Sequence, residues 1–153
     1  MCDILFRGFH KDENEDKKVF YNGEWHSGGW IVGDGIHFPK SVNYIGTCWI
    51  DGMSKIANDW VQVIPETVGR YTGLPDKNGK KIFEGDIVRH GYTITYSNGK
   101  KSDFYTNMLI SFSNHYGGWI VGVQGILTFK TIIKYNIEVI GNIFENPELL
   151  KNI

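Results

Sequence analysis

Alanine is almost missing from this sequence: among 153 residues it occurs once, at Ala57. Proline occurs four times and cysteine twice. Because alanine is the best helix former, a chain with so little of it does not favour long helices. Isoleucine and valine together supply 29 residues, and 19 glycines offer sites for chain reversal. Abundant β-branched residues and frequent turn residues predict an all-β, mainly β, fold.

The two cysteines, Cys2 and Cys48, are too few for the disulfide framework of a small secreted protein. Reduced thiols in a cytosolic protein are the simpler interpretation. The start, Met1-Cys2-Asp3, lacks the basic residues of a signal peptide, and no long apolar run follows it. No segment reaches the roughly 18 apolar residues of a membrane span. We therefore expect a cytoplasmic protein that does not bind a membrane.

The charges are almost balanced, with a formal net charge of −1. Residues 1–65 carry 6 basic and 9 acidic residues, a net of −3, and residues 66–153 carry 10 and 8, a net of +2. Nucleic-acid-binding domains usually carry a strong basic patch. This asymmetry is too small to predict a nucleic-acid groove by itself.

Residue patterns that support catalysis or metal binding are also missing. The five histidines are scattered, and the sequence has no CxxC or HxH pair at metal-ligand spacing. Neither cysteine has a partner base nearby in the sequence. Glu84 and Asp86 are two residues apart, which suits paired carboxylates on a strand, but a turn at Gly85 explains them better. No glycine-rich loop opens a phosphate-binding helix. We expect no enzyme, no catalytic residue, no metal and no cofactor.

Turn signals are dense, above all between Thr67 and Val88. Pro75-Asp76 suits the corner of a turn. Asn-Gly pairs at 22–23, 78–79 and 98–99 predict two-residue hairpin turns, since both residue types tolerate positive φ. The β-branched and aromatic runs between these turns predict short strands, among them Tyr92-Thr93-Ile94-Thr95-Tyr96, which alternates apolar and hydroxyl side chains.

The order of these signals predicts two parts: an N-terminal β region over residues 1–65 and a small β-barrel or sandwich over residues 66–153. Ser54 is a candidate cap for one helical turn. At the end of the chain, Asn146 as cap, Pro147 at the first helical position and Glu148 near the helix dipole predict a short helical turn.

The hexapeptide GGWIVG occurs twice, at residues 28–33 and 117–122. A duplicated β unit would produce such an echo. However, the flanking residues of the two copies do not match, and repeat architectures need a fixed period. Similar strand chemistry arising by coincidence is the favoured interpretation. A duplication requires that both copies have equivalent neighbours in their sheets.

Three blocks of the sequence resemble the YopX family, which phages and bacterial prophages encode. The first block is Phe6-Arg7-Gly8. The second runs from Val63 to Val88 and contains Val68-Gly69-Arg70-Tyr71-Thr72-Gly73-Leu74. The third runs from Glu138 to Leu150. Arg70 departs from the family pattern, where glutamine is usual, and so does Gly8-Phe9-His10.

The resemblance covers nearly the whole chain and implies a mostly β protein with an SH3-like barrel in its C-terminal half. It also implies the cytoplasm of a bacterial host as the location. The family has no established activity, so no catalytic residue can be transferred from it. The resemblance therefore implies only the general role of an uncharacterised phage-encoded accessory protein.

Binding is the better class of function for this chain, because its five tryptophans and eight tyrosines exceed what a small core easily buries. The candidate binding residues are Arg70, Tyr71, Lys77, Lys80, Asp86 and Trp119. The competing interpretation makes these residues turn formers, solvated charges and core packing.

Three hypotheses remain at this stage. The first is a non-enzymatic β module that binds a host or phage protein, or itself as a homo-oligomer. The second is a nucleic-acid-binding module that uses basic residues of the C-terminal barrel. These residues are Arg70, Lys77, Lys80, Lys81, Lys100 and Lys101. The third, an enzyme, is the least favoured and would require a deep pocket with converging polar groups.

Overall fold

A computed structural model describes residues 5–10, 19–21, 24–26, 29–37, 48–52, 60–123 and 125–151. The chain forms two compact units, Met1–Tyr71 and Thr72–Ile153. The division lies inside strand β7, Gly69–Pro75, whereas the sequence predicted it between residues 65 and 66. Each unit is described by itself below.

The N-terminal unit is an antiparallel sheet in the order β6-β5-β4-β1, with the first residues of β7 paired to β1. A separate hairpin of β2 and β3 and a 3₁₀ turn, η2, complete the described elements. The bounds are β1 Phe6–His10, β2 Val19–Tyr21, β3 Glu24–His26, β4 Gly29–His37, β5 Cys48–Gly52, β6 Trp60–Val63 and η2 Pro65–Thr67.

The core of this unit is small and aliphatic. Ile31, Ile50, Val61 and Val63 are all buried and pack together. Gly8 of β1 lies against this cluster: a Cβ at Gly8 would lie 2.7 Å from Cγ2 of Val63. The close packing leaves no room for a side chain at this point of β1.

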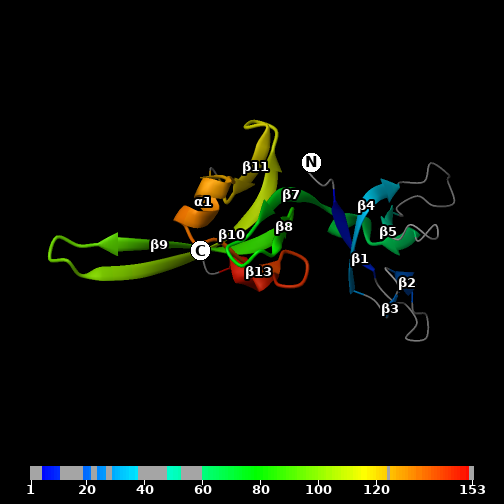
Figure 1. Cartoon of the computed structure of the whole chain (residues 1–153), viewed down its shortest axis with the longest axis horizontal. Coiled ribbons are helices and arrows are strands. Elements are labelled where there is room, and N and C mark those ends of the chain that lie inside the picture. The colour runs from blue at the N-terminus through cyan, green and yellow to red at the C-terminus, as the bar shows by residue number, and fades with distance from the viewer. Residues whose placement is uncertain are drawn as a thin grey trace. The chain divides into compact units, whose positions relative to one another are not determined.

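The C-terminal unit has a five-stranded antiparallel sheet in the order β12-β11-β10-β9-β13, and the later part of β7 pairs with β8. Figure 1 shows β9 and β10 extending as a long hairpin beyond the other strands of this unit. The bounds are β8 Lys81–Phe83, β9 Asp86–Thr95, β10 Lys101–Ser113, β11 Gly118–Val121, β12 Gly125–Ile126, α1 Phe129–Lys134, β13 Glu138–Asn142 and η3 Pro147–Leu150.

One short helix, α1, covers part of the C-terminal core. Thr128 begins it with a capping box, in which its hydroxyl accepts from the amide of Thr131 and the Thr131 hydroxyl accepts from the amide of Thr128. Ile132 is buried within a cluster of aliphatic residues, most of which belong to strands. The other buried members are Ile82, Val88, Ile110, Val121, Leu127, Ile137 and Val139.

The prediction of an all-β fold is confirmed, while the SH3-like barrel stays a prediction. The short helical turn at the C-terminus is also confirmed, as the 3₁₀ turn η3. Asn146 occupies the predicted cap position, but its side chain caps no amide of the turn and instead accepts from the amide of Asn142. The predicted cap at Ser54, and Cys2, lie outside the described residues.

The Asn-Gly turns at 78–79 and 98–99 differ from the prediction of two-residue turns. Each turn is a three-residue loop, 77–79 or 97–99, closed by a backbone hydrogen bond between the residues that flank it. The amide of Asp76 donates to the carbonyl of Lys80, and the amide of Tyr96 donates to the carbonyl of Lys100. Only the glycines have positive φ, 85° at Gly79 and 79° at Gly99. This is the pattern of a type I turn followed by a glycine bulge.

The two GGWIVG segments are not one duplicated unit. The first lies in β4, between β1 and β5, and the second lies in β11, between β10 and β12. The first buries its isoleucine, Ile31, whereas the second buries its valine, Val121. Because neighbouring residues of a strand point to opposite faces, the two copies turn opposite faces toward their cores. Coincidence, the favoured interpretation, is therefore confirmed.

Candidate functional site

The β9–β10 hairpin projects from the C-terminal unit as a two-stranded ribbon. Strand β13 pairs with β9 only as far as Arg89, and β11 pairs with β10 only from Ile110 onward. Beyond Gly91 and Tyr105, β9 and β10 pair only with each other among the described residues. We call residues 91–105 the arm (Figure 1).

One face of the arm is apolar and exposed. Tyr92 and Phe104 are directly opposite in the register, and their rings stack with centroids 5.4 Å apart. Four apolar side chains on this face are between 38% and 45% exposed. They are Tyr92, Ile94, Tyr96 and Phe104.

This apolar face continues the inner face of the sheet. Val88, two residues before His90 and four before Tyr92, is fully buried in the core, and Met108, opposite Val88, packs against it. Side chains two apart on a strand share a face. The alternation that fills the core therefore continues along the arm, where the described residues provide no layer to cover it.

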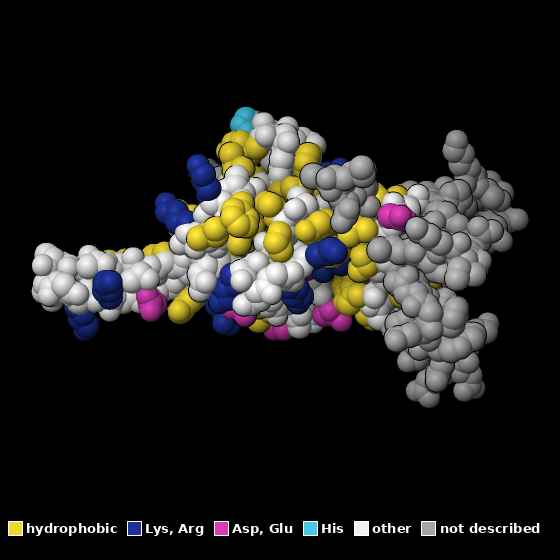
Figure 2. Space-filling model, in the orientation of Figure 1, with side chains coloured by type: hydrophobic (Ala, Val, Ile, Leu, Met, Phe, Trp, Pro, Cys, Tyr) yellow, Lys and Arg dark blue, Asp and Glu magenta, His cyan; other side chains and the backbone are white. Residues whose placement is uncertain are grey.

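The opposite face of the arm is polar near the tip. Lys101 and Asp103 lie there, and the hydroxyl of Thr93 donates to Oδ1 of Asp103 at 2.6 Å across the strand pair. In Figure 2 basic and acidic side chains lie along the arm, and hydrophobic side chains gather over the body of the unit. Near its tip the arm thus has one polar and one apolar face, while Tyr105, 61% exposed, lies on the polar side at the base.

The base of the arm is held by a packed aromatic contact. The His90 ring stacks on Tyr135 with centroids 4.1 Å apart, and the amide of Gly91 donates to the Tyr135 carbonyl at 2.7 Å. Burial of the His90 imidazole lowers its pKa from the usual value. The ring is therefore neutral at neutral pH. The ring stacking and the hydrogen bond fix the base of the arm, whereas its outer part is exposed.

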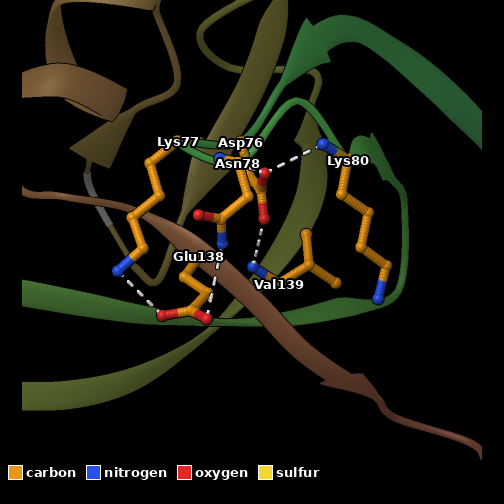
Figure 3. A network of polar contacts seen from close by, with 6 residues as sticks. All are labelled: Asp76, Lys77, Asn78, Lys80, Glu138 and Val139. Atoms are coloured by element: carbon orange, nitrogen blue, oxygen red, sulfur yellow. Dashed lines mark hydrogen bonds and ion pairs between the residues drawn. The ribbon is translucent and has the colours of Figure 1, made fainter.

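The turn before β8 carries a second polar feature, centred on the buried carboxylate of Asp76 (Figure 3). Its Oδ1 accepts from the amides of Asn78 at 2.7 Å and Lys80 at 2.9 Å, and its Oδ2 accepts from the amide of Val139 at 3.0 Å. The amide of Lys77 also donates to the carbonyl of Ile137. This carboxylate joins the turn to β13, which gives Asp76 a structural role.

An ion pair lies beside this network. Lys77 Nζ is 2.9 Å from Glu138 Oε2, and the Asn78 amide group donates to Glu138 Oε1 at 3.4 Å. The hydrogen bond from Lys77 is the main cause of a lowered pKa at the Glu138 carboxyl. In Figure 3 the Lys80 side chain extends away from this pair.

Replacing Lys77 with alanine is expected to raise the pKa of Glu138 toward its ordinary value. A lowered folded-state pKa stabilises the fold above the unfolded value, and this contribution is lost as pH falls through the folded value. The acid-induced loss of stability should therefore become shallower. An NMR titration of the Glu138 carboxyl would measure the shift. Lys80→Ala, in the same turn, is the matched control and should leave the Glu138 titration unchanged.

The predicted site residues belong to both units and to several elements. Arg70 and Tyr71 belong to the N-terminal unit. In the other unit, Lys77 and Lys80 lie on the turn before β8, and Trp119 packs against the core from β11. Asp86 is buried, and its Oδ2 accepts from the amide of Phe83 at 2.8 Å.

The turn interpretation therefore fits Asp86 and Gly85, which has φ of 82°. None of the six candidates lies on the arm. The signal that marked the arm was the alternation of Tyr92, Ile94 and Tyr96, which predicted a strand without showing that its apolar side lacks cover.

Two further observations concern the described residues alone. They contain no group of three or more histidine, cysteine, aspartate or glutamate side chains placed to hold a metal ion. No helix among them has the length and apolar character needed to cross a membrane.

These features define a mainly β protein of two units, whose C-terminal unit carries a projecting amphipathic hairpin. The family model described as YopX protein matches residues 5–151, so the chain belongs to the YopX family. Among solved structures, the crystal structure of protein EF1440 from Enterococcus faecalis is similar, with 23% identity and a TM-score of 0.45. The match covers 96% of this chain and 98% of that one. A comparison with curated proteins finds no match.

Proposed function

We propose that this chain is a phage-encoded accessory protein that acts in the bacterial cytoplasm as a non-enzymatic β module, binding a protein partner through the arm. The observation that carries the proposal is the exposed apolar face formed by Tyr92, Ile94, Tyr96 and Phe104. Exposed aromatic side chains are favoured anchors in protein interfaces.

The size of this face supports a binding role. With about 200 Å² for each complete side chain, the four residues leave roughly 350 Å² of mostly apolar surface in water. The largest apolar patch on a monomeric protein is about 300–600 Å² and is often functional. Covering such a face removes apolar area from water, which is the main driving force of association.

Phe104→Ser is expected to weaken partner capture by about tenfold or more, the effect typical of losing an aromatic anchor. The measurement is quantitative mass spectrometry of proteins retained by the tagged chain from phage-infected cells supplied with an untagged copy of the chain. Phe129→Ser is the matched control, because Phe129 is 60% exposed on α1, outside the arm.

The proposal requires that the wild type and Phe129→Ser both retain at least one protein that Phe104→Ser loses. The untagged copy of the chain counts as such a protein. Equal retention by all three forms would contradict a role for the arm. Retention of nothing above background would contradict the binding function itself.

Nucleic acid is a second candidate, favoured by Lys100 and Lys101 at the tip of the arm, beside its aromatic face. Basic residues next to stacking aromatics suit single-stranded nucleic acid. Two phosphate contacts would give a weak salt dependence, with a slope of about −1.4 for a single strand. Absence of binding to a labelled single strand at about 50 mM salt would exclude this candidate.

A further inference from the structure

In the arm, the edge of β9 that faces away from β10 has backbone groups that pair with no described strand. The amide of Tyr96 donates toward β10, to Lys100, whereas the amide of Gly91 donates away from β10, to Tyr135. Backbone groups of successive strand residues alternate in direction. The N–H and C=O groups of Thr93 and Thr95 therefore point away from β10, where no described strand pairs with them. We call Tyr92 to Tyr96 the β9 edge.

The sequence of the β9 edge is the same in both directions: Tyr92-Thr93-Ile94-Thr95-Tyr96. Two copies of a palindromic strand match when they run antiparallel, residue by residue. A twofold axis at Ile94 places Ile94 opposite Ile94 of a second copy. It also places Thr93 opposite Thr95 and Tyr92 opposite Tyr96. Identical surfaces that meet across a twofold axis form the commonest kind of homodimer interface.

The hydrogen-bonding direction agrees with this register. Thr93 and Thr95 carry the outward amides and carbonyls, so each threonine meets its counterpart as a hydrogen-bonded pair. Ile94 then meets its counterpart as a non-hydrogen-bonded pair, in which the side chains are closest. Shifting the register by one residue would oppose outward groups of one copy to inward groups of the other.

The two edges of the arm differ in whether they carry charged residues, which prevent an exposed edge from pairing with another strand. The β9 edge carries no charged residue and no proline, and tyrosine, threonine and isoleucine all favour strands. The β10 edge carries Lys101 and Asp103. Natural proteins use charges and proline on exposed edges to prevent strand addition. This protection is present on β10 and missing from β9.

From these observations we propose that the arm binds a second copy of this chain, by antiparallel pairing of the β9 edges about Ile94. The two arms form one continuous four-stranded ribbon, β10-β9-β9-β10, with the apolar faces merged on one side. Cross-strand contacts of isoleucine and tyrosine pairs stabilise it. The inference rests on the proposed function and names the partner that the arm takes.

The area involved sets the expected strength. The merged apolar face amounts to roughly 700 Å², and edge pairing buries only part of it, which places the interface below the standard size of about 1,600 Å². We expect a dimer that dissociates on dilution in the range of about 1–100 μM. Sedimentation velocity of the full chain over that range would show the mass change from twice the chain mass to the chain mass.

Ile94→Lys is expected to raise the dimer dissociation constant at least about tenfold at low salt, because like charges would meet on the twofold axis. Ser102→Lys is the matched control. Ser102 lies opposite Ile94 in the register, on the same face of the arm but on β10. The control adds the same charge away from the proposed interface and should keep the wild-type dissociation constant within about threefold.

Mixing Ile94→Lys with Ile94→Glu gives the decisive result. Each variant alone should be monomeric, whereas the mixture should form a heterodimer that high salt weakens. Recovery of association also shows that both variants are folded. A wild-type chain that stays monomeric across the range, or equal dissociation constants for Ile94→Lys and Ser102→Lys, would overturn the inference.

The two proposals fail in different ways. A monomeric wild type that still captures another protein in a Phe104-dependent manner would overturn self-pairing and leave the binding function in place. A wild-type dimer that Ile94→Lys does not affect would locate self-association elsewhere on the chain. Arm-independent capture with no self-association would overturn both.

Discussion

Replacing Asp76 with alanine is expected to lower the free energy of unfolding of the C-terminal unit by about 3 kcal/mol. The substitution removes the acceptor of three backbone amides, those of Asn78, Lys80 and Val139. Val139 is buried, so water cannot fully replace the lost partner of its amide. Hydrogen bonds to an ionised group are the stronger kind, and a buried donor left unpaired carries the full desolvation cost.

Urea unfolding followed by the fluorine signal of labelled tryptophan would measure this effect, because Trp119 is the only tryptophan in residues 72–153. Asn98→Ala is the matched control. The Asn98 side chain accepts from the amide of Lys100, the residue that corresponds to Lys80 in the other Asn-Gly turn, but Asn98 is exposed. The control should cost about 0.5 kcal/mol. Equal losses in both variants would show that the link to β13 contributes nothing.

Replacing Gly8 with alanine is expected to destabilise the N-terminal unit by about 2–3 kcal/mol, the range of an overpacked core. The added Cβ would lie 2.7 Å from Cγ2 and 2.8 Å from Cβ of Val63, and 3.0 Å from Cδ1 of Ile50. Both partners are buried, so neither can move without disturbing its neighbours. The cost arises from space alone, because Gly8 does not have a positive φ.

The four tryptophans in residues 1–71 would report this unfolding. Gly118→Ala in the C-terminal unit is the matched control, and Trp119 would report its unfolding. Gly118 is also a strand glycine without positive φ, and the nearest atom to its added Cβ is 3.9 Å away. Because alanine limits the unfolded chain more than glycine does, the control should be neutral or stabilising by up to about 0.5 kcal/mol. A loss in Gly8→Ala no larger than that of the control would contradict the packing argument.

Local signals predicted the fold class and most of its elements. Asn78-Gly79 and Asn98-Gly99 placed two hairpins, because turn residues act through their own backbone. The loop length was missed, since an Asn-Gly pair suits both a two-residue turn and the last two positions of a three-residue loop that ends in a glycine bulge. Pro147 placed the last 3₁₀ turn, whereas the Asn146 side chain accepts from the amide of Asn142, four residues earlier, and not from an amide of the turn.

The candidate site depended on information that local signals do not contain. The alternation through Tyr92, Ile94 and Tyr96 predicted a strand with one apolar face, and such a face is normally buried. Whether another layer covers that face depends on where β13 and β11 stop pairing, which tertiary structure decides. The predicted binding residues followed aromatic and charged composition instead, and Trp119 proved to pack against the core.

The contact between Asp76 and Val139 has a consequence for biosynthesis, because 63 residues of chain separate the two partners. A polypeptide leaves the ribosome at roughly 5–20 residues per second, with N-terminal parts folding first. The turn at Asp76 is therefore made several seconds before the strand that completes it. During that interval the carboxylate keeps only its local amides, and the C-terminal unit reaches its final state once the last strand has emerged.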